Sequence, residues 1–108
     1  MVIPLKKLIS TAHKSPHLKN KHSTLVFRGG SLITSGYNHG DIHSEVNALS
    51  QIWPNKRKGT SIVNLMIKTR SGNFGNSRPC EECMFFLRNA GIIKVIYYDG
   101  KTFVEERI

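Results

Sequence analysis

Apolar residues recur along the chain at two different spacings, and the alternation between them predicts an α/β fold. Spacings of three and four residues, as at Leu5, Leu8 and Ile9, are typical of amphipathic helices. This pattern predicts helices over residues 5–13, 42–53 and 79–90. Short apolar runs bounded by Gly, Pro, Asn and Ser predict strands over residues 24–27, 31–34, 61–67, 92–98 and 103–107.

The order of these elements, α-β-β-α-β-α-β-β, predicts a mixed sheet. Strands that are separated by a helix pair in parallel through right-handed crossovers. Turn-forming residues at Arg28-Gly29-Gly30 and at Asp99-Gly100 predict antiparallel hairpins near both ends of the chain. Residues 71–77 are rich in Gly, Asn and Ser and are expected to form a loop.

Single residues mark the ends of the second and third predicted helices. Asp41 is the expected cap of the second helix, and Pro79 is expected at the first position of the third, where its missing N–H costs nothing. Trp53 shares a helical face with Val46, so we expect it to pack the end of the second helix onto the sheet. The alternative is functional, because Trp53 stands beside Lys56-Arg57-Lys58 and an aromatic among cations can stack a base.

The length of 108 residues and the hydrophobic content of 39 % fit a single globular domain over residues 1–108. No segment has enough consecutive apolar residues to span a membrane, and the N-terminus lacks the apolar run of a secretory signal. The 2 cysteines are too few and too close together for a secreted disulfide framework. We therefore expect an intracellular, cytoplasmic protein that has no membrane partner.

Basic residues are concentrated in the first two thirds of the chain, whose overall net charge is +9. Residues 1–40 contain six Lys and Arg and no acidic residue, whereas residues 71–108 contain five residues of each sign. Such asymmetry favours an anionic partner, either a nucleic acid or the phosphate of a nucleotide. A basic surface that only increases solubility is the alternative.

Both cysteines lie in the segment Pro79-Cys80-Glu81-Glu82-Cys83, and a second motif, His43-Ser44-Glu45, precedes it. Cys80 and Cys83 are three residues apart at the start of a predicted helix, so both sulfurs face the same way and the helix N-terminus favours their thiolates. With His43 they offer Zn²⁺ three protein ligands and leave the fourth position to water, as in catalytic zinc sites. The pKa of that water would be pulled toward neutrality, and Glu45 can carry its proton.

Two other interpretations of the Cys-x-x-Cys segment remain open. A structural zinc site needs a fourth protein ligand, and none of the other histidines has a diagnostic spacing to the cysteines. These histidines are His13, His17, His22 and His39. A redox pair needs a thioredoxin-like context, which Pro79 before the first cysteine does not resemble.

The two motifs match the signature H-x-E…P-C-x-x-C of zinc nucleobase deaminases, and the chain resembles the cytidine and deoxycytidylate deaminase superfamily. Residues 21–38 are similar to the family's first hairpin and the Gly-Tyr-Asn that follows it, and residues 91–98 are similar to the strand after the second metal helix. The resemblance implies a three-layer α/β/α sandwich around a five-stranded mixed sheet. The hairpin turn at Asp99-Gly100 places the chain nearer the cytidine-deaminase-like branch, in which the fifth strand is antiparallel.

The resemblance also implies roles for individual residues. The implied zinc ligands are His43, Cys80 and Cys83. Glu45 would be the proton shuttle, and Asn38 matches an asparagine that contacts the substrate sugar or base. Taken alone, Asn38 is better explained as a turn residue with a left-handed backbone. Ser44 stands where alanine is commoner in the family, a small change that we expect to be tolerated.

Arg78 directly precedes the third predicted helix and can bind a substrate phosphate there. A solvated loop arginine is the alternative for this residue, and the sequence slightly favours it.

The implied activity is the zinc-dependent hydrolytic deamination of cytosine to uracil, with release of ammonia, in a free cytidine nucleoside or nucleotide. The basic N-terminal region favours an alternative substrate, a base within single-stranded DNA, RNA or tRNA. A third interpretation is a catalytically inactive, zinc-stabilised module that binds nucleic acid. Relatives in this family often form dimers or tetramers, so a homo-oligomer is also an expectation.

Overall fold

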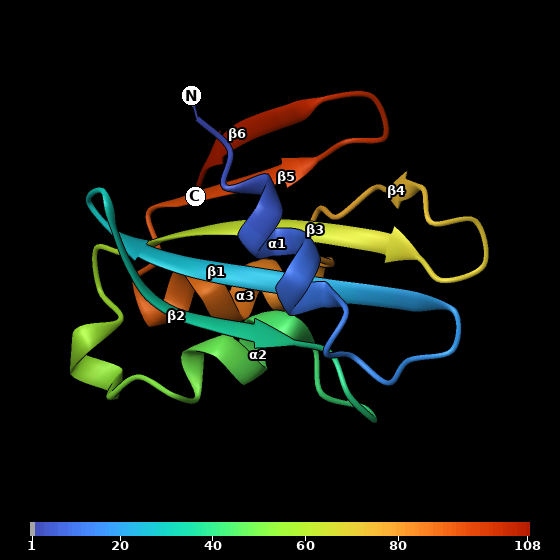
Figure 1. Cartoon of the computed structure of the whole chain (residues 1–108). Helices are drawn as coiled ribbons and strands as arrows, with labels where there is room; N and C mark the ends of the chain where they lie inside the picture. Colours follow the sequence, from blue (N-terminus) through green and yellow to red (C-terminus); the bar gives the residue numbers. More distant parts are fainter. Residues whose placement is uncertain (1) are drawn as a thin grey trace.

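An open, mixed β-sheet with helices on both faces makes up the computed structural model, which describes residues 2–108 (Figure 1). The six strands are β1 (Asn20–Arg28), β2 (Ser31–Tyr37), β3 (Ser61–Lys68), β4 (Phe74–Gly75), β5 (Lys94–Tyr98) and β6 (Phe103–Arg107). The three α-helices of this part of the chain are α1 (Leu5–Ala12), α2 (Ser44–Leu49) and α3 (Glu81–Ala90), and η1 (Pro54–Lys56) is a single 3₁₀ turn. The predicted α/β class and mixed sheet are confirmed. No helix within residues 2–108 is long and apolar enough to cross a membrane.

The direction of the strands defines two edges of the sheet. The strand order is β2-β1-β3-β5-β6, and β4 pairs with the end of β3. β1 is antiparallel to both β2 and β3, whereas β3 and β5 are parallel, so β2, β3 and β5 all run in the same direction. We call the edge at which these three strands end the carboxyl edge, and the edge at which they begin the amino edge. β6 returns antiparallel to β5, as the Asp99-Gly100 turn predicts.

The short strand β4 makes the sheet six-stranded rather than five-stranded. A loop was expected over residues 71–77, but Phe74 and Gly75 pair with Ile67 and Met66 of β3. The N–H of Lys68 donates to the carbonyl of Asn73 at 2.8 Å and closes the hairpin. Two residues surrounded by Gly, Asn and Ser carry no strand periodicity, which is why the sequence pattern did not indicate this strand.

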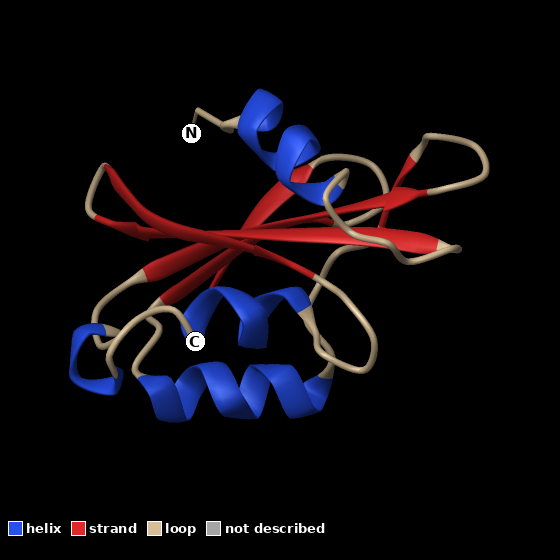
Figure 2. Cartoon of the chain, turned by 60° about the horizontal axis from the view of Figure 1, so that its bottom comes forward, coloured by secondary structure: helices blue, strands red, loops and turns tan. Residues whose placement is uncertain are grey.

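Apolar side chains pack against both faces of the sheet. Figure 2 shows α1 against one face and α2 and α3 against the other. Side chains alternate along a strand, so Val63 and Leu65 of β3 pack with residues of α1, whereas Ile62 packs with residues of α2 and α3. Asn64 lies on the same face as Ile62 and is only 3 % exposed. A buried polar residue in the middle of a central strand must find hydrogen-bond partners there.

The two helices of the carboxyl edge start later than the sequence predicts. His43 is the N-cap of α2 and Cys80 is the N-cap of α3, with extended backbones whose ψ angles are 154° and 167°. The helical turns therefore begin only after these two residues. The prediction of Asp41 as the cap of α2 is wrong, and Pro79 lies one residue before the cap of α3 rather than at its first helical position.

Trp53 does not pack onto the sheet. α2 ends at Leu49, and Ile52, which is 8 % exposed, supplies the apolar contact at this end of the helix. Trp53 follows it as the N-cap of η1 and is 79 % exposed. The expectation that Trp53 anchors the helix end is therefore wrong, because the helix stops before its spacing can place the indole on the apolar face.

Gly36 controls how closely β2 approaches α2. Gly36 is buried, and a Cβ at this position would lie 2.7 Å from the Cα of Ala48 in α2. Gly36→Ala should therefore lower the free energy of unfolding by about 1–3 kcal/mol, the usual range for overpacked cores, as measured by urea denaturation. Gly30→Ala is the matched control, because nothing lies within 4 Å of a Cβ built at Gly30. Equal stabilities of the two variants would contradict this packing.

Candidate metal centre

The two sequence motifs meet at the carboxyl edge of the sheet. α2 follows β2, and α3 follows β3 and β4, so both helices start at this edge. His43 and Cys80 cap the two helices, and Cys83 lies in the first turn of α3. One ligand atom from each of these residues lies within 4.8 Å of the other two, and His43 Nδ1 is 3.0 Å from Cys83 Sγ. The three side chains could together hold a metal ion.

The chemistry of these donors fits a metal ion that prefers sulfur and imidazole ligands. Burial, and after it the Glu45 carboxylate, raise the pKa of the Cys83 thiol above its ordinary value. A cation is therefore needed to stabilise the Cys83 thiolate in this position. The Cys83 N–H donates to Cys80 Sγ at 3.4 Å, at a helix N-terminus where negative charge is favoured.

No fourth side chain completes the cluster within residues 2–108. Two of the histidines considered as a fourth ligand have other partners. His17 Nδ1 accepts a hydrogen bond from the N–H of Asn20 at 3.0 Å, and His39 Nε2 lies 3.3 Å from Asn47 Nδ2. The described part of the chain therefore does not form the closed four-ligand arrangement of a structural zinc site.

A cavity of about 520 Å³ opens beside the cluster. His43, Cys80 and Glu45 border it, together with His22 from β1. Burial lowers the pKa of His22, while the nearby Glu45 carboxylate acts in the opposite direction. A neutral imidazole at His22 is therefore favoured. Sequence reasoning considered His22 only as a possible fourth ligand and assigned it no role, because a histidine in a strand has no spacing that relates it to the metal motifs.

Glu45 is buried in the wall of this cavity, with 5 % of its surface exposed. Its Oε2 accepts a hydrogen bond from Asn64 Nδ2 at 3.0 Å, and its Oε1 lies 3.3 Å from the donor Ser44 Oγ. A carboxylate removed from water needs such donors. The fold therefore fixes the side chain that the sequence assigned as a proton carrier.

Asn64 is in turn held by side chains from three other segments. Its Oδ1 accepts from Thr24 Oγ1 of β1 at 2.6 Å, and Thr24 Oγ1 lies 2.8 Å from Ser44 Oγ of α2. Ser77, which lies before α3, donates from its Oγ to the Asn64 carbonyl at 2.9 Å. Sequence reasoning did not identify this network. The one feature that could have indicated it is Asn64 itself, a single polar residue inside the apolar run of β3.

Thr24 and Ser44 have two hydroxyl protons between them for three contacts, which are Thr24 with Asn64, Thr24 with Ser44, and Ser44 with Glu45. The two shortest contacts are satisfied when Ser44 donates to Thr24 and Thr24 donates to Asn64. Ser44 can donate to Glu45 Oε1 only in the alternative arrangement, in which it does not donate to Thr24, whereas Asn64 donates to Glu45 Oε2 in both arrangements and is the lasting donor. Glu45 also borders the cavity, so the same carboxylate lies beside the space next to the cluster.

Asn38 lies in the cavity wall, but its side chain already bonds to β1. Its Oδ1 accepts from the N–H of His22 at 2.8 Å, and its Nδ2 donates to the carbonyl of Asn20 at 3.0 Å. Within residues 2–108 no residue other than glycine has a positive φ angle, so the alternative of a left-handed turn residue at Asn38 is wrong. Asn38 therefore extends the pairing of β1 with β2 and forms part of the wall of the cavity.

Arg78 borders the cavity and pairs with two carboxylates. Its Nε and Nη2 donate to the two oxygens of Glu106 at 3.0 and 2.9 Å, and its Nη1 lies 3.2 Å from Glu81 Oε1. These bonds, first those to Glu106, raise the pKa of the guanidinium. Arg78 is therefore an exposed loop arginine, as the alternative expected, but its guanidinium is already paired with two carboxylates.

No family model matches the chain in a comparison with known proteins, and no curated protein matches it. The functional argument therefore rests on the residues and their geometry.

Loss of any one of the three clustered ligands should remove the metal. If the cluster binds a metal, the wild-type chain should hold one equivalent of a divalent ion by elemental analysis, and after Co²⁺ substitution it should show a thiolate charge-transfer band in its absorption spectrum. His43→Ala and Cys83→Ser should each lose most of the bound metal. His13→Ala is the control, because His13 is exposed at the end of α1. Full metal content in Cys83→Ser would contradict the assignment.

Asn64→Leu should destabilise the protein without changing the volume of the core much. The substitution removes the donor to Glu45 and the acceptor of Thr24, so buried polar groups are left without partners. The expected decrease in the free energy of unfolding is about 1–3 kcal/mol, measured by urea denaturation. Asn89→Leu on the exposed face of α3 should change stability little. If Asn64→Leu were as stable as Asn89→Leu, the network would not support Glu45.

Proposed function

We propose that this chain is a zinc-dependent hydrolytic deaminase that converts cytosine to uracil in a free cytidine nucleoside or nucleotide. The observation that carries the proposal is the position of Glu45. Its buried carboxylate is anchored by Asn64 and borders the same cavity as His43 and Cys80. A structural metal site has no use for such a carboxylate, whereas hydrolysis needs a proton carrier beside the metal.

We also propose that the fold is a cytidine-deaminase-like three-layer sandwich. Five strands form the continuous path of the sheet, and the last of them is antiparallel to its neighbour. α1 covers one face and α2 and α3 cover the other (Figure 2). These features support the proposal, with β4 as a short addition at the end of β3.

In this proposal His43, Cys80 and Cys83 hold Zn²⁺, which when bound supplies a water of lowered pKa. Glu45 takes a proton from the attacking water as the water oxygen adds to C4 of the cytosine ring. Glu45 passes this proton to the ring nitrogen and then moves a second proton, from the new hydroxyl, to the departing amino group. Water and cytosine are consumed, and uracil and ammonia are released.

The cavity supports a substrate of the size of a single nucleotide. Its volume of about 520 Å³ lies within the range of small-molecule pockets, about 300–1,000 Å³. Neutral His22 and the remaining Nδ2 hydrogen of Asn38 can bond to the sugar or the base. Arg78 can accept a phosphate in exchange for Glu81, because an exposed ion pair is worth at most about 1 kcal/mol. Glu106 would keep the guanidinium in place during this exchange.

Glu45→Gln should abolish turnover and keep the metal. Glutamine retains the volume and an acceptor for Asn64 but cannot carry the proton, so the rate should fall by at least about 10²–10⁴-fold. Uracil formation is measured with cytidine, deoxycytidine, their monophosphates and a single-stranded oligonucleotide, alongside zinc content. Glu105→Gln is the control, because Glu105 pairs with Lys94 on the surface of the sheet. Retained activity in Glu45→Gln would exclude the assigned role, and a zinc-loaded wild type that turns over none of these substrates would exclude a deaminase.

A further inference from the structure

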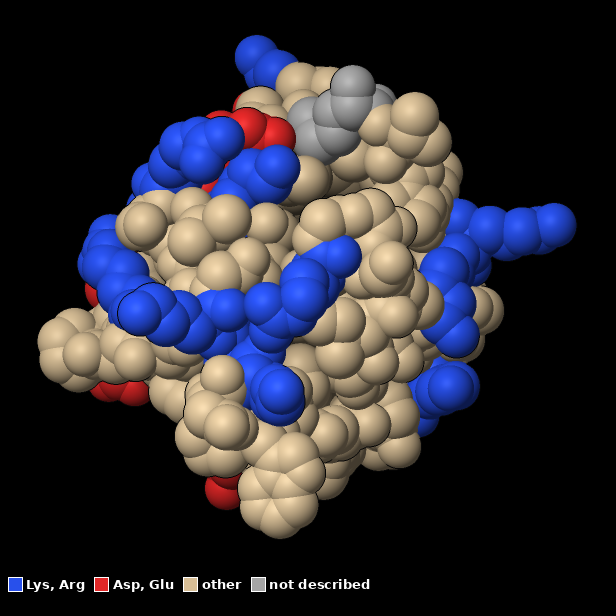
Figure 3. Space-filling view, turned by 90° about the vertical axis from the view of Figure 1, so that its left-hand side faces the viewer, with Lys and Arg blue, Asp and Glu red and all other residues tan. Residues whose placement is uncertain are grey.

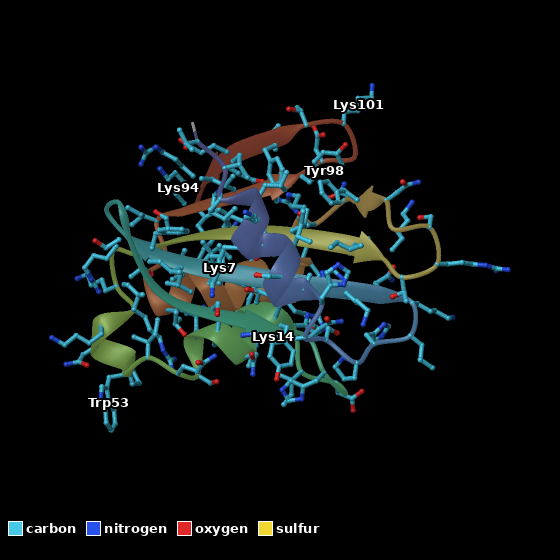
Figure 4. All side chains as sticks on the ribbon, viewed as in Figure 1. Lys7, Lys14, Trp53, Lys94, Tyr98 and Lys101 are labelled. Atoms are coloured by element: carbon cyan, nitrogen blue, oxygen red, sulfur yellow. The ribbon has the colours of Figure 1, made fainter. Side chains whose placement is uncertain are left out.

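Trp53 is the only tryptophan in the chain, and it is 79 % exposed. Figure 4 shows its indole pointing away from the body of the molecule. A large aromatic side chain in water contributes nothing to the core. Because the core contact here is made by Ile52, the packing of the protein does not explain why an indole occupies this position.

The indole belongs to the amino edge, opposite the metal centre. It lies beside η1 and shares a hollow of about 700 Å³ with Arg28 at the end of β1 and Ser31 at the start of β2. His43 and Cys80 lie beyond the other ends of these strands, at the carboxyl edge. The hollow is therefore separate from the cavity of the proposed deaminase.

The charge around Trp53 is positive and unneutralised. Arg28, Lys56 and Lys58 are exposed, and none of them takes part in the ion pairs found in the described part of the chain. The sequence contains no acidic residue in residues 1–40 or 46–80 that could pair with them. Figure 3 shows this end of the molecule, with a band of basic side chains across it.

The loop that presents these lysines has a fixed backbone. The Arg28 guanidinium donates to the carbonyls of Lys56 and Lys58, and Thr60 Oγ1 donates to the carbonyl of Arg57 at 2.7 Å. The N–H of Gly59 donates to the carbonyl of Gly91 at 2.8 Å. The backbone carbonyls of Lys56, Arg57 and Lys58 therefore all accept hydrogen bonds from other groups of the protein. The loop consequently presents exposed lysine side chains to a ligand, and not free carbonyl oxygens. A loop ordered in advance loses less entropy on binding.

We infer that the amino edge binds single-stranded nucleic acid, with a base stacked on Trp53 and the backbone phosphates held by Lys56, Lys58 and Arg28. Stacking on an exposed aromatic needs an unpaired base, which a duplex does not offer. The hollow also contains hydroxyl and amide groups that can bond to base edges, from Ser31, Thr34 and Gln51. Ile33 also lines the hollow and is 39 % exposed, so a membrane surface is the other occupant that the test below must separate from a nucleic acid. The inference does not depend on deaminase activity, because the two sites lie at opposite edges of the sheet.

The test is a titration of the metal-loaded full chain with a single-stranded oligo-dT, followed by quenching of Trp53 fluorescence. Because Trp53 is the only indole, quenching reports stacking at this position. Trp53→Ala should weaken binding by about tenfold or more, measured by anisotropy of a labelled oligonucleotide, and Trp53→Phe should restore most of it. Phe85→Ala is the matched control, because Phe85 is also an exposed aromatic, at 69 %, but lies on α3.

The role of the lysines is tested by salt dependence. The double variant Lys56→Ala/Lys58→Ala should reduce the slope of log affinity against log salt by about 1.4, since each phosphate contact to a single strand contributes about 0.7. The control, Lys6→Ala/Lys7→Ala on α1, removes the same charge from another surface and should leave the slope unchanged. Equal effects of the two double variants would show that net charge alone drives binding and would overturn the inference.

Two further results would also overturn it. One is equal affinity for duplex DNA, independent of Trp53. The other is a blue shift of Trp53 fluorescence with anionic phospholipid vesicles in the absence of quenching by the oligonucleotide. Neither measurement involves turnover, so the outcome is separate from that of the deaminase assay.

Discussion

The burial of the Glu45 carboxylate is the constraint on which the site depends. A carboxylate that is 5 % exposed has lost most of its hydration, and without donors it would strongly destabilise the fold. Asn64 supplies the lasting donor, and Thr24 and Ser77 fix Asn64 in turn. These residues come from β1, β3, α2 and the segment before α3. Hydrogen bonds between buried residues therefore determine the position of the carboxylate.

The residues of the His43, Cys80 and Cys83 cluster could be predicted from the sequence because the geometry within each motif is local. Cys80 and Cys83 are three residues apart, and His43 and Glu45 are two residues apart, so each pair is positioned by its own helix start. The α/β class and the last hairpin followed from similarly local signals. The Asp99-Gly100 turn, for example, determines that β6 is antiparallel to β5.

The features that the sequence did not predict depend on contacts between distant residues. Asn64 interrupts an apolar run, and only the approach of Thr24 and Glu45 shows why the interruption is tolerated. Trp53 fits the helical spacing of α2, but the helix ends at Leu49 and Ile52 occupies the core instead. The pairing of Arg78 with Glu106 was missed for the same reason, because Glu106 lies 28 residues away in β6.

The start of α2 also reveals a conflict between local stability and the site. N-caps are usually Ser, Thr, Asp or Asn, whose side chains bond to the first turn. α2 has only six residues, and its cap, His43, makes no such bond, because its imidazole faces Cys83 instead. A helix this short does not hold itself together in water, so its position depends on close packing against β2 at Gly36. A metal ion bound between the caps would add a direct link between α2 and α3, because the free energy of metal binding also stabilises the folded state. His43 is therefore better explained by its contact with Cys83 than by the helix that it begins, whereas Cys80 also caps α3 by accepting from the Cys83 N–H.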